Sequence, residues 1–310
     1  MLPNLIMPGA QKSGTTFLAA LIAQHPEIFL PSVKEPAHFL TAIDKPLAKP
    51  NGKPQRLAYA KSDTYRALYA DGAQSKYRLD ASTGYFAVPG VASAIRQEIG
   101  EAKIICVVRQ PVDRAYSAYV YHRQLEDTSC ASFEDALDEE RSINERGEVV
   151  IPQPYFGTGE YARNISVWQS EFGFENVLVL FFEDLLADPQ RACSTVFDFL
   201  DLEPFTVDPV VEKNASHEPL TSWRRLVLMA SRGDLPVLAP VSFVMRTLIP
   251  PAKRNDLRLA IKRNLRPSPG SKRPPKLGAE QRAKYTRRFH DDIDQLARMT
   301  GKDLSHWKAD

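Results

Sequence analysis

The sequence has few cysteines, no long apolar stretch and almost no excess of charge. Its three cysteines are odd in number and far apart in a chain of 310 residues, which excludes a disulfide-stabilised domain and the usual zinc spacings. The longest apolar segment, 235–249, contains two prolines and an arginine, so it falls short of the ~18 uninterrupted apolar residues that span a membrane. With a net charge of +2, there is no general attraction to nucleic acid, and any basic site must be local.

The amino terminus lacks the basic segment and the long apolar core of a secretion signal. A glycine-bounded loop begins at Gly9 and leaves little that could be cleaved away. Because cysteines outside a disulfide framework favour a reducing compartment, we expect a cytoplasmic protein without a transmembrane segment. The 43% hydrophobic content is ordinary for a globular protein and is sufficient for one substantial core.

The strongest signal is the stretch Gly-Ala-Gln-Lys-Ser-Gly-Thr-Thr over residues 9–16. The apolar segment 5–7 before it predicts a buried strand, and apolar residues at helical spacing predict a helix over 17–23. Such a loop points consecutive N–H groups at one anion, and the helix adds the positive end of its dipole. The nucleotide-binding pattern G-x-x-x-x-G-K-[ST] is nearly met, but Thr15 stands in the lysine's place and Lys12 lies three residues earlier.

This loop resembles the 5′-phosphosulfate loop of sulfotransferases that use 3′-phosphoadenosine 5′-phosphosulfate (PAPS), in particular the bacterial and glycosaminoglycan-type branch. The resemblance implies that Lys12 stabilises the charge developing on the leaving phosphate oxygen. It also implies that the 5′-phosphate is bound by Gln11, Lys12, Ser13, Gly14, Thr15 and Thr16.

A second motif follows the clearest buried strand, predicted over 103–108. Arg109 ends this strand, and Pro111 suits the first turn of a helix. An arginine at the strand end and Ser117 on the helix can share one phosphate, since a guanidinium offers paired donors. The resemblance extends here, because the family's 3′-phosphate site has the form Arg, x-Pro, x-Asp-Arg, x-x-Ser. It implies that Arg109 and Ser117 bind the donor's 3′-phosphate.

A carboxylate beside the phosphate loop is well placed as a general base, although Lys34 and Glu35 could equally form a plain surface pair. The family carries a Lys-Glu-Pro-like motif here, and the resemblance implies that Glu35 takes the acceptor's proton. His38 and His122 are the competing bases. Family motifs further imply that the acceptor is bordered by Lys34, His38, Asp80, Ser82 and Tyr85. Ala81 departs from the family's lysine, which weakens the case for a heparan-like acceptor.

Two further segments leave alternatives open. The strand predicted over 176–182 ends in Glu183 and Asp184, which could hold Mg²⁺ in a kinase or be the family's structural Glu-Asp-Leu. The basic region 219–265 predicts a helical cap, for which a membrane-surface or lipid contact is a further hypothesis. The resemblance implies that a loop containing Lys272 and Arg273 closes over the 3′-phosphate.

Together these features predict an α/β fold of the P-loop type, with a central parallel sheet and helices on both faces. We expect one domain over 1–310, with 219–276 as a helical cap and basic loop. The predicted function is sulfuryl transfer from PAPS to a hydroxyl, or as second choice an amine, of a carbohydrate, lipid or small molecule. No metal is expected, and adenosine 3′,5′-bisphosphate (PAP) would be the product. The alternatives are a Mg-ATP kinase and a non-catalytic binder of anionic glycans or lipids.

Overall fold

The computed structural model describes the chain except residues 56, 125–126, 152–154, 210–276 and 309–310. The chain's internal contacts separate Met1–Asn214 together with Lys276–Asp310 from Ala215–Pro275. The cap and basic loop expected over 219–276, including Lys272 and Arg273, therefore lie outside the described residues, and the expectation of one domain stays a prediction.

The first of these units is built on a five-stranded sheet with the order β2-β4-β1-β5-β7. Its strands are β1 (Leu5–Gly9), β2 (Ile28–Phe29), β4 (Tyr77–Asp80), β5 (Lys103–Val108) and β7 (Val177–Phe181). Every pairing is parallel, with Leu5 opposite Leu79 on one side and opposite Lys103 on the other. The predicted α/β fold with a central parallel sheet is confirmed.

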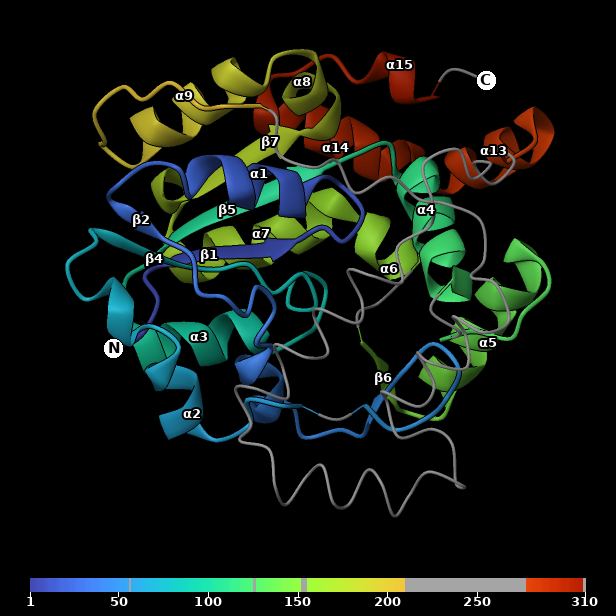
Figure 1. The fold of residues 1–310 in the computed structure, drawn as a ribbon. Helices are drawn as coiled ribbons and strands as arrows, with labels where there is room; N and C mark the ends of the chain where they lie inside the picture. Colours follow the sequence, from blue (N-terminus) through green and yellow to red (C-terminus); the bar gives the residue numbers. More distant parts are fainter. Residues whose placement is uncertain (56, 125–126, 152–154, 210–276, 309–310) are drawn as a thin grey trace. The chain divides into compact units, whose positions relative to one another are not determined.

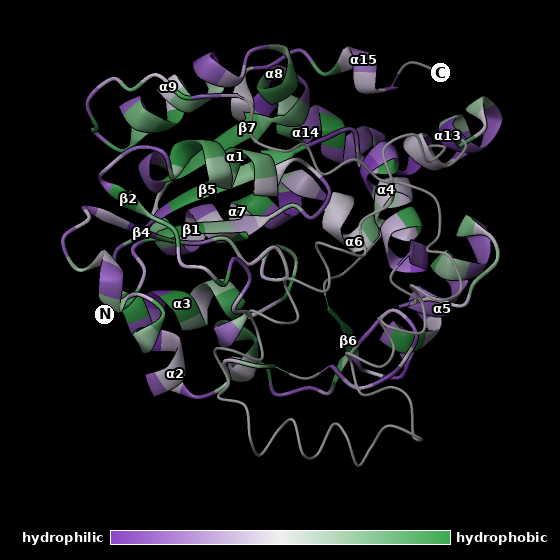
Figure 2. Ribbon diagram, in the orientation of Figure 1, coloured by the Kyte–Doolittle hydropathy of each residue, from purple (hydrophilic) through white to green (hydrophobic). Residues whose placement is uncertain are grey.

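Side chains on β1 and β5 alternate between two apolar clusters. Leu5 and Ile105 belong to the cluster formed with α1 (Thr15–Ile22) and α9 (Pro189–Phe199). Ile6 and Ile104 belong to the cluster formed with α3 (Val91–Ile99), α7 (Tyr161–Phe172) and α14 (His290–Thr300). Because successive side chains of a strand point to opposite faces, continuous apolar strands require helices on both sides. Figure 1 shows helices on both faces of the sheet, and the hydrophobic colouring of β1 and β5 in Figure 2 matches their burial.

The remaining elements complete the unit. The helices are α2 (Ser62–Ala67), α4 (Pro111–Gln124), α5 (Phe133–Glu145), α6 (Phe156–Gly159), α8 (Phe182–Ala187), α13 (Ala279–Thr286) and α15 (Ser305–Lys308). Short 3₁₀ turns are η1 (His38–Ala42), η2 (Ala70–Gly72), η3 (Phe174–Asn176) and η5 (Arg287–Phe289). A two-stranded parallel sheet pairs β3 (Leu47–Ala48) with β6 (Val149–Val150). Across the described ranges, no helix is both long and apolar enough to cross a membrane.

The C-terminal segment 279–300 forms two helices, α13 and α14, joined at η5, where Phe289 packs into the core and is 1% exposed. Thr286 is also buried, and its Oγ1 accepts a hydrogen bond from Gln110 Nε2. Residues 149–159 contain β6 and α6.

Candidate functional site

The site lies where the parallel strands end, since the loops after β1, β4 and β5 leave the sheet at one edge. Ala10 N donates to Val107 O at 2.7 Å, which extends the β1–β5 ladder into the loop 10–14. Gly14 precedes α1 with φ of 86° and supplies no side-chain cap. The first N–H groups of α1 are therefore available to an anion, and the helix dipole favours one there.

Gly14 could not be replaced by a residue with a side chain without strain. A Cβ built there would lie 2.8 Å from a ring carbon of Phe182, the first residue of α8. The same Phe182 ring packs against Arg109, whose guanidinium carbon lies 4.7 Å from the ring centroid. Phe182 thus holds the loop after β1 and the arginine after β5 against a common surface.

The electrostatics of Lys12 are strongly altered by its surroundings. Its backbone is left-handed, with φ of 68°, and its ammonium is largely desolvated. Burial first, and the neighbouring Arg109 second, lower the pKa of Lys12 to about 8, while the charge of Glu35 opposes this. Arg109 Nη1 also donates to Lys12 O at 3.4 Å. Both residues are partly buried, and a phosphate would stabilise two cations held this close.

Glu35 lies in the loop after β2 and is within electrostatic range of Lys12. Its Oε1 accepts a hydrogen bond from Lys34 Nζ at 2.8 Å, and its side chain is 48% exposed. Lys34 Nζ also donates to Ala81 O at 3.4 Å, which ties this loop to the segment after β4. The carboxylate is thus held by a neighbour, open to solvent and close to the phosphate loop.

The predicted acceptor residues Asp80, Ser82 and Tyr85 form a buried network instead of lining an open surface. Asp80 is 0% exposed and accepts hydrogen bonds from Tyr65 at 2.7 Å, Ser82 Oγ at 2.6 Å and Tyr85 at 3.2 Å. Burial raises the pKa of Asp80, and these donors oppose the rise. Ser82 Oγ accepts from Ala37 N at 3.0 Å, and Ala37 has φ of 55°. The network therefore fixes the loop that carries Glu35, which is a positioning role.

The two histidines considered as bases are both in the core. His38 is 4% exposed, its Nδ1 lies 2.7 Å from Tyr59 O, and its ring stacks on Tyr65 at 4.3 Å between centroids. His122 is 2% exposed, with Nδ1 4.0 Å from Asp127 Oδ2. Neither ring is open to solvent in this structure, whereas the side chain of Glu35 is 48% exposed.

The remaining described residues that are predicted to bind the donor lie at the same edge of the sheet. Gln11 is 9% exposed, Ser13 is fully buried and Thr15 is 4% exposed, while Thr16 is exposed and Ser117 is half-buried on α4. Arg114 is completely buried and donates to Gln11 O at 3.5 Å and to Tyr155 O. Arg114 thereby holds the loop 10–14 in place through the backbone of Gln11.

The acidic pair after β7 already has protein partners. Glu183 Oε1 accepts from Gln110 N at 3.4 Å, and Asp184 pairs with Lys302 at 2.6 Å. Within the described ranges, no group of three or more His, Cys, Asp and Glu side chains could hold a metal ion. These contacts agree with the structural interpretation of Glu183 and Asp184.

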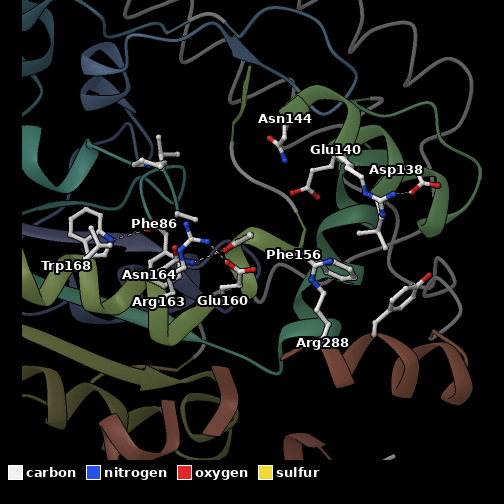
Figure 3. Close-up of a pocket in the computed structure, with 18 of the residues that line it drawn as sticks. Phe86, Asp138, Glu140, Asn144, Phe156, Glu160, Arg163, Asn164, Trp168 and Arg288 are labelled. Carbon is white, nitrogen blue, oxygen red and sulfur yellow. Dashed lines mark hydrogen bonds and ion pairs between the residues drawn. The ribbon is translucent and has the colours of Figure 1, made fainter. Parts of the chain in front are cut away.

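A cavity of about 740 Å³ lies between α5 and α7 (Figure 3). Glu140 of α5 lines it and faces Glu160 and Arg163 across the space. Burial raises the pKa of Glu140 to about 7, opposed by Arg114 and Arg288. Arg114 thus lies between this carboxylate and the phosphate loop. None of the predicted site residues in the described part of the chain lines the cavity.

Sequence reasoning missed two aromatic residues at the site. Phe182 packs against Arg109, as described above, and Tyr121 of α4 lies beneath Lys12, with Nζ 4.4 Å from the ring centroid. For Tyr121 a signal existed, because it follows Ser117 by four residues and so shares its helix face. No sequence signal pointed to Phe182.

The comparisons with known proteins agree with this geometry. Residues 2–221 match the profile of the sulfotransferase domain family. Human heparan sulfate glucosamine 3-O-sulfotransferase 3B1 is 26% identical over 207 residues, which are 67% of this chain and 48% of the human protein. The bifunctional heparan sulfate N-deacetylase/N-sulfotransferase 1 of Caenorhabditis briggsae is 23% identical over 216 residues, 66% of this chain and 23% of that protein.

Among solved structures, a sulfotransferase from Alicyclobacillus acidocaldarius superposes with a TM-score of 0.69 at 23% identity, covering 100% of both chains. At this identity the similarity supports the fold. The chain spans between 23% and 48% of the length of the two curated relatives described above.

Proposed function

Because the chain belongs to the sulfotransferase family, we propose that it transfers a sulfuryl group from PAPS to an acceptor hydroxyl, with an amine as second choice. One observation carries the proposal: Lys12, Arg109 and Glu35 follow three different strands and lie close together at the same edge of the sheet. The acceptor is a carbohydrate, a lipid or another small molecule. The names of the relatives point to sugar acceptors, whereas Ala81 argues against a heparan-like chain.

The residues present fit a bisphosphorylated donor. Lys12 and the free N–H groups at the start of α1 face one anion, which suits the 5′-phosphate. Arg109 and Ser117 belong to the β5–α4 segment and would hold the 3′-phosphate by charge-assisted hydrogen bonds. Because Gly14 has no Cβ, the Phe182 ring can pack directly against the loop.

PAPS supplies a sulfuryl group already activated by its bond to the 5′-phosphate. Glu35 would accept the proton of the acceptor hydroxyl as the acceptor oxygen bonds to sulfur. The bond from sulfur to the phosphate oxygen breaks in line, and Lys12 stabilises the charge left on that oxygen. Lys34 keeps the Glu35 carboxylate oriented beside the site.

The donor assignment is tested by calorimetry with PAP and AMP. Two charge-assisted contacts to the 3′-phosphate, each worth about 1.5–3 kcal/mol, predict at least tenfold tighter binding of PAP. Arg109→Met should remove the preference, whereas Arg66→Met, which alters a half-exposed arginine paired with Glu98, should keep it. Equal affinity of the unmodified protein for PAP and AMP would refute the donor site.

The base is tested with labelled PAPS and an acceptor found by screening, beside ATP and with or without EDTA. Glu35→Gln should bind PAP normally and lose about 10²–10⁴-fold in turnover. Glu101→Gln, which changes a carboxylate that is 76% exposed, is the matched control. Full turnover in Glu35→Gln would transfer the role to another residue, and phosphoryl transfer that stops in EDTA and returns with Mg²⁺ would favour the kinase alternative.

A further inference from the structure

The ammonium of Lys12 is held in an uncommon way. Among the described residues, none accepts a hydrogen bond from Nζ, and no carboxylate forms an ion pair with it. Glu35 is the nearest acidic influence on Lys12, but its own hydrogen bond goes to Lys34 at 2.8 Å. The contact that Nζ does make is with the face of Tyr121, 4.4 Å from the ring centroid.

We propose that Tyr121 is a positioning residue for sulfuryl transfer, which holds the Lys12 ammonium over its ring beside the leaving phosphate oxygen. The inference rests on the proposed function. An aromatic face attracts a cation through its quadrupole and carries no net charge. A carboxylate in the same place would neutralise the lysine before the reaction, whereas the ring leaves its full charge for the phosphate oxygen.

The position of Tyr121 on α4 suits this role. Tyr121 is four residues after Ser117, so both lie on one helix face. The helix that would hold the 3′-phosphate through Ser117 therefore also holds the catalytic lysine. The left-handed backbone of Lys12 sets the direction in which its side chain leaves the loop. The Tyr121 ring then constrains the position of the ammonium at the other end of that side chain.

Tyr121 also favours the charged form of Lys12. The charged groups facing the ammonium are Arg109 from the end of β5, which disfavours protonation, and Glu35 from the loop after β2, which favours it. Like Glu35, the Tyr121 ring favours the protonated form of Lys12. Removing the ring should therefore lower the pKa of Lys12 while Arg109 and Glu35 stay in place.

The experiment compares Tyr121→Phe, Tyr121→Met and Tyr121→Leu with the unmodified protein. The reactivity of Lys12 towards trace acetic anhydride is followed by mass spectrometry from pH 6 to 11, with the exposed Lys45 as internal reference. Without the ring, the midpoint for Lys12 should fall by about 0.5–1.5 pH units. Tyr121→Phe keeps the ring and should keep the midpoint.

A matched control is Tyr77→Leu, which removes the ring that Lys76 lies over at 5.7 Å, at the opposite edge of the sheet. This variant should leave the Lys12 midpoint unchanged. In turnover measured at about pH 6, where Lys12 stays mostly protonated even with the lowered midpoint, Tyr121→Leu should lower kcat about tenfold with little change in PAP affinity, and Tyr121→Phe should restore kcat. A purely structural role would weaken PAP binding and kcat together.

An unchanged Lys12 midpoint in both Tyr121→Met and Tyr121→Leu would overturn the proposal. A loss of kcat in Tyr121→Phe as large as that in Tyr121→Leu would also overturn the proposal, because it would assign the effect to the hydroxyl and not to the ring. If the unmodified protein fails to bind PAP, the proposed function fails. The labelling result still decides whether Tyr121 holds Lys12, so the two failures are distinguishable.

Discussion

The altered pKa of Lys12 predicts a specific pH dependence of donor binding. Burial and Arg109 bring this pKa from 10.5 to about 8 in the free protein. The protonated lysine attracts the 5′-phosphate of PAP, and the neutral amine does not. Affinity should therefore be highest below pH 8 and fall as the pH rises through 8.

The size of the effect follows from the fraction of protonated lysine. With a pKa of about 8, roughly nine tenths of Lys12 is charged at pH 7 and roughly one tenth at pH 9. PAP should therefore bind about tenfold more weakly at pH 9 than at pH 7. The ligand does not contribute to this change, because the second ionisation of a phosphate monoester, near pH 6, is complete above pH 7.

Calorimetry with PAP at half-unit steps from pH 6.5 to 9.5 measures the effect. Lys12→Met should bind PAP weakly and without this pH dependence. Lys12→Arg retains a charge throughout the range and should also give a flat profile. A flat profile for the unmodified protein, or the same fall in Lys12→Met, would show that Lys12 is not the titrating group and would refute the electrostatic reasoning.

Two further predictions concern the buried groups around the site. Asp80→Ala leaves the hydroxyls of Tyr65, Ser82 and Tyr85 without their acceptor. The free energy of unfolding measured in urea should therefore fall by about 2–4 kcal/mol. An unchanged urea midpoint would mean that the network does not stabilise the fold. Burial raises the pKa of Glu140 from 4.5 to about 7, so its contribution to folding is complete below pH 4.5 and lost as the pH rises through 7. Glu140→Gln should remove this pH dependence of the unfolding free energy, which is on the order of 3 kcal/mol. A stability difference between the two proteins that stays constant from pH 4.5 to 7.5 would contradict this.

Much of the site could be predicted from local sequence. The apolar segments before Gly9 and Arg109 have no polar face, and such strands are stable only between two layers of helices. Parallel strands end at the same edge, so the loops carrying Lys12 and Arg109 had to meet there. Pro111 marks the start of α4 by its fixed backbone angle, and α4 begins there, whereas α1 begins at Thr15, two residues before the start predicted for that helix.

The tertiary structure decided which polar residues face the ligand and which serve the core. His38, Asp80 and Tyr85 lie in motifs that suggest contact with an acceptor, yet all three are at most 4% exposed. Whether a polar side chain is buried depends on distant partners such as Tyr59 and Tyr65, and no local pattern specifies those. The same holds for Lys12, because its charge is common to any lysine, whereas its lowered pKa and its place over Tyr121 arise only when α4, the loop after β2 and the end of β5 pack around it.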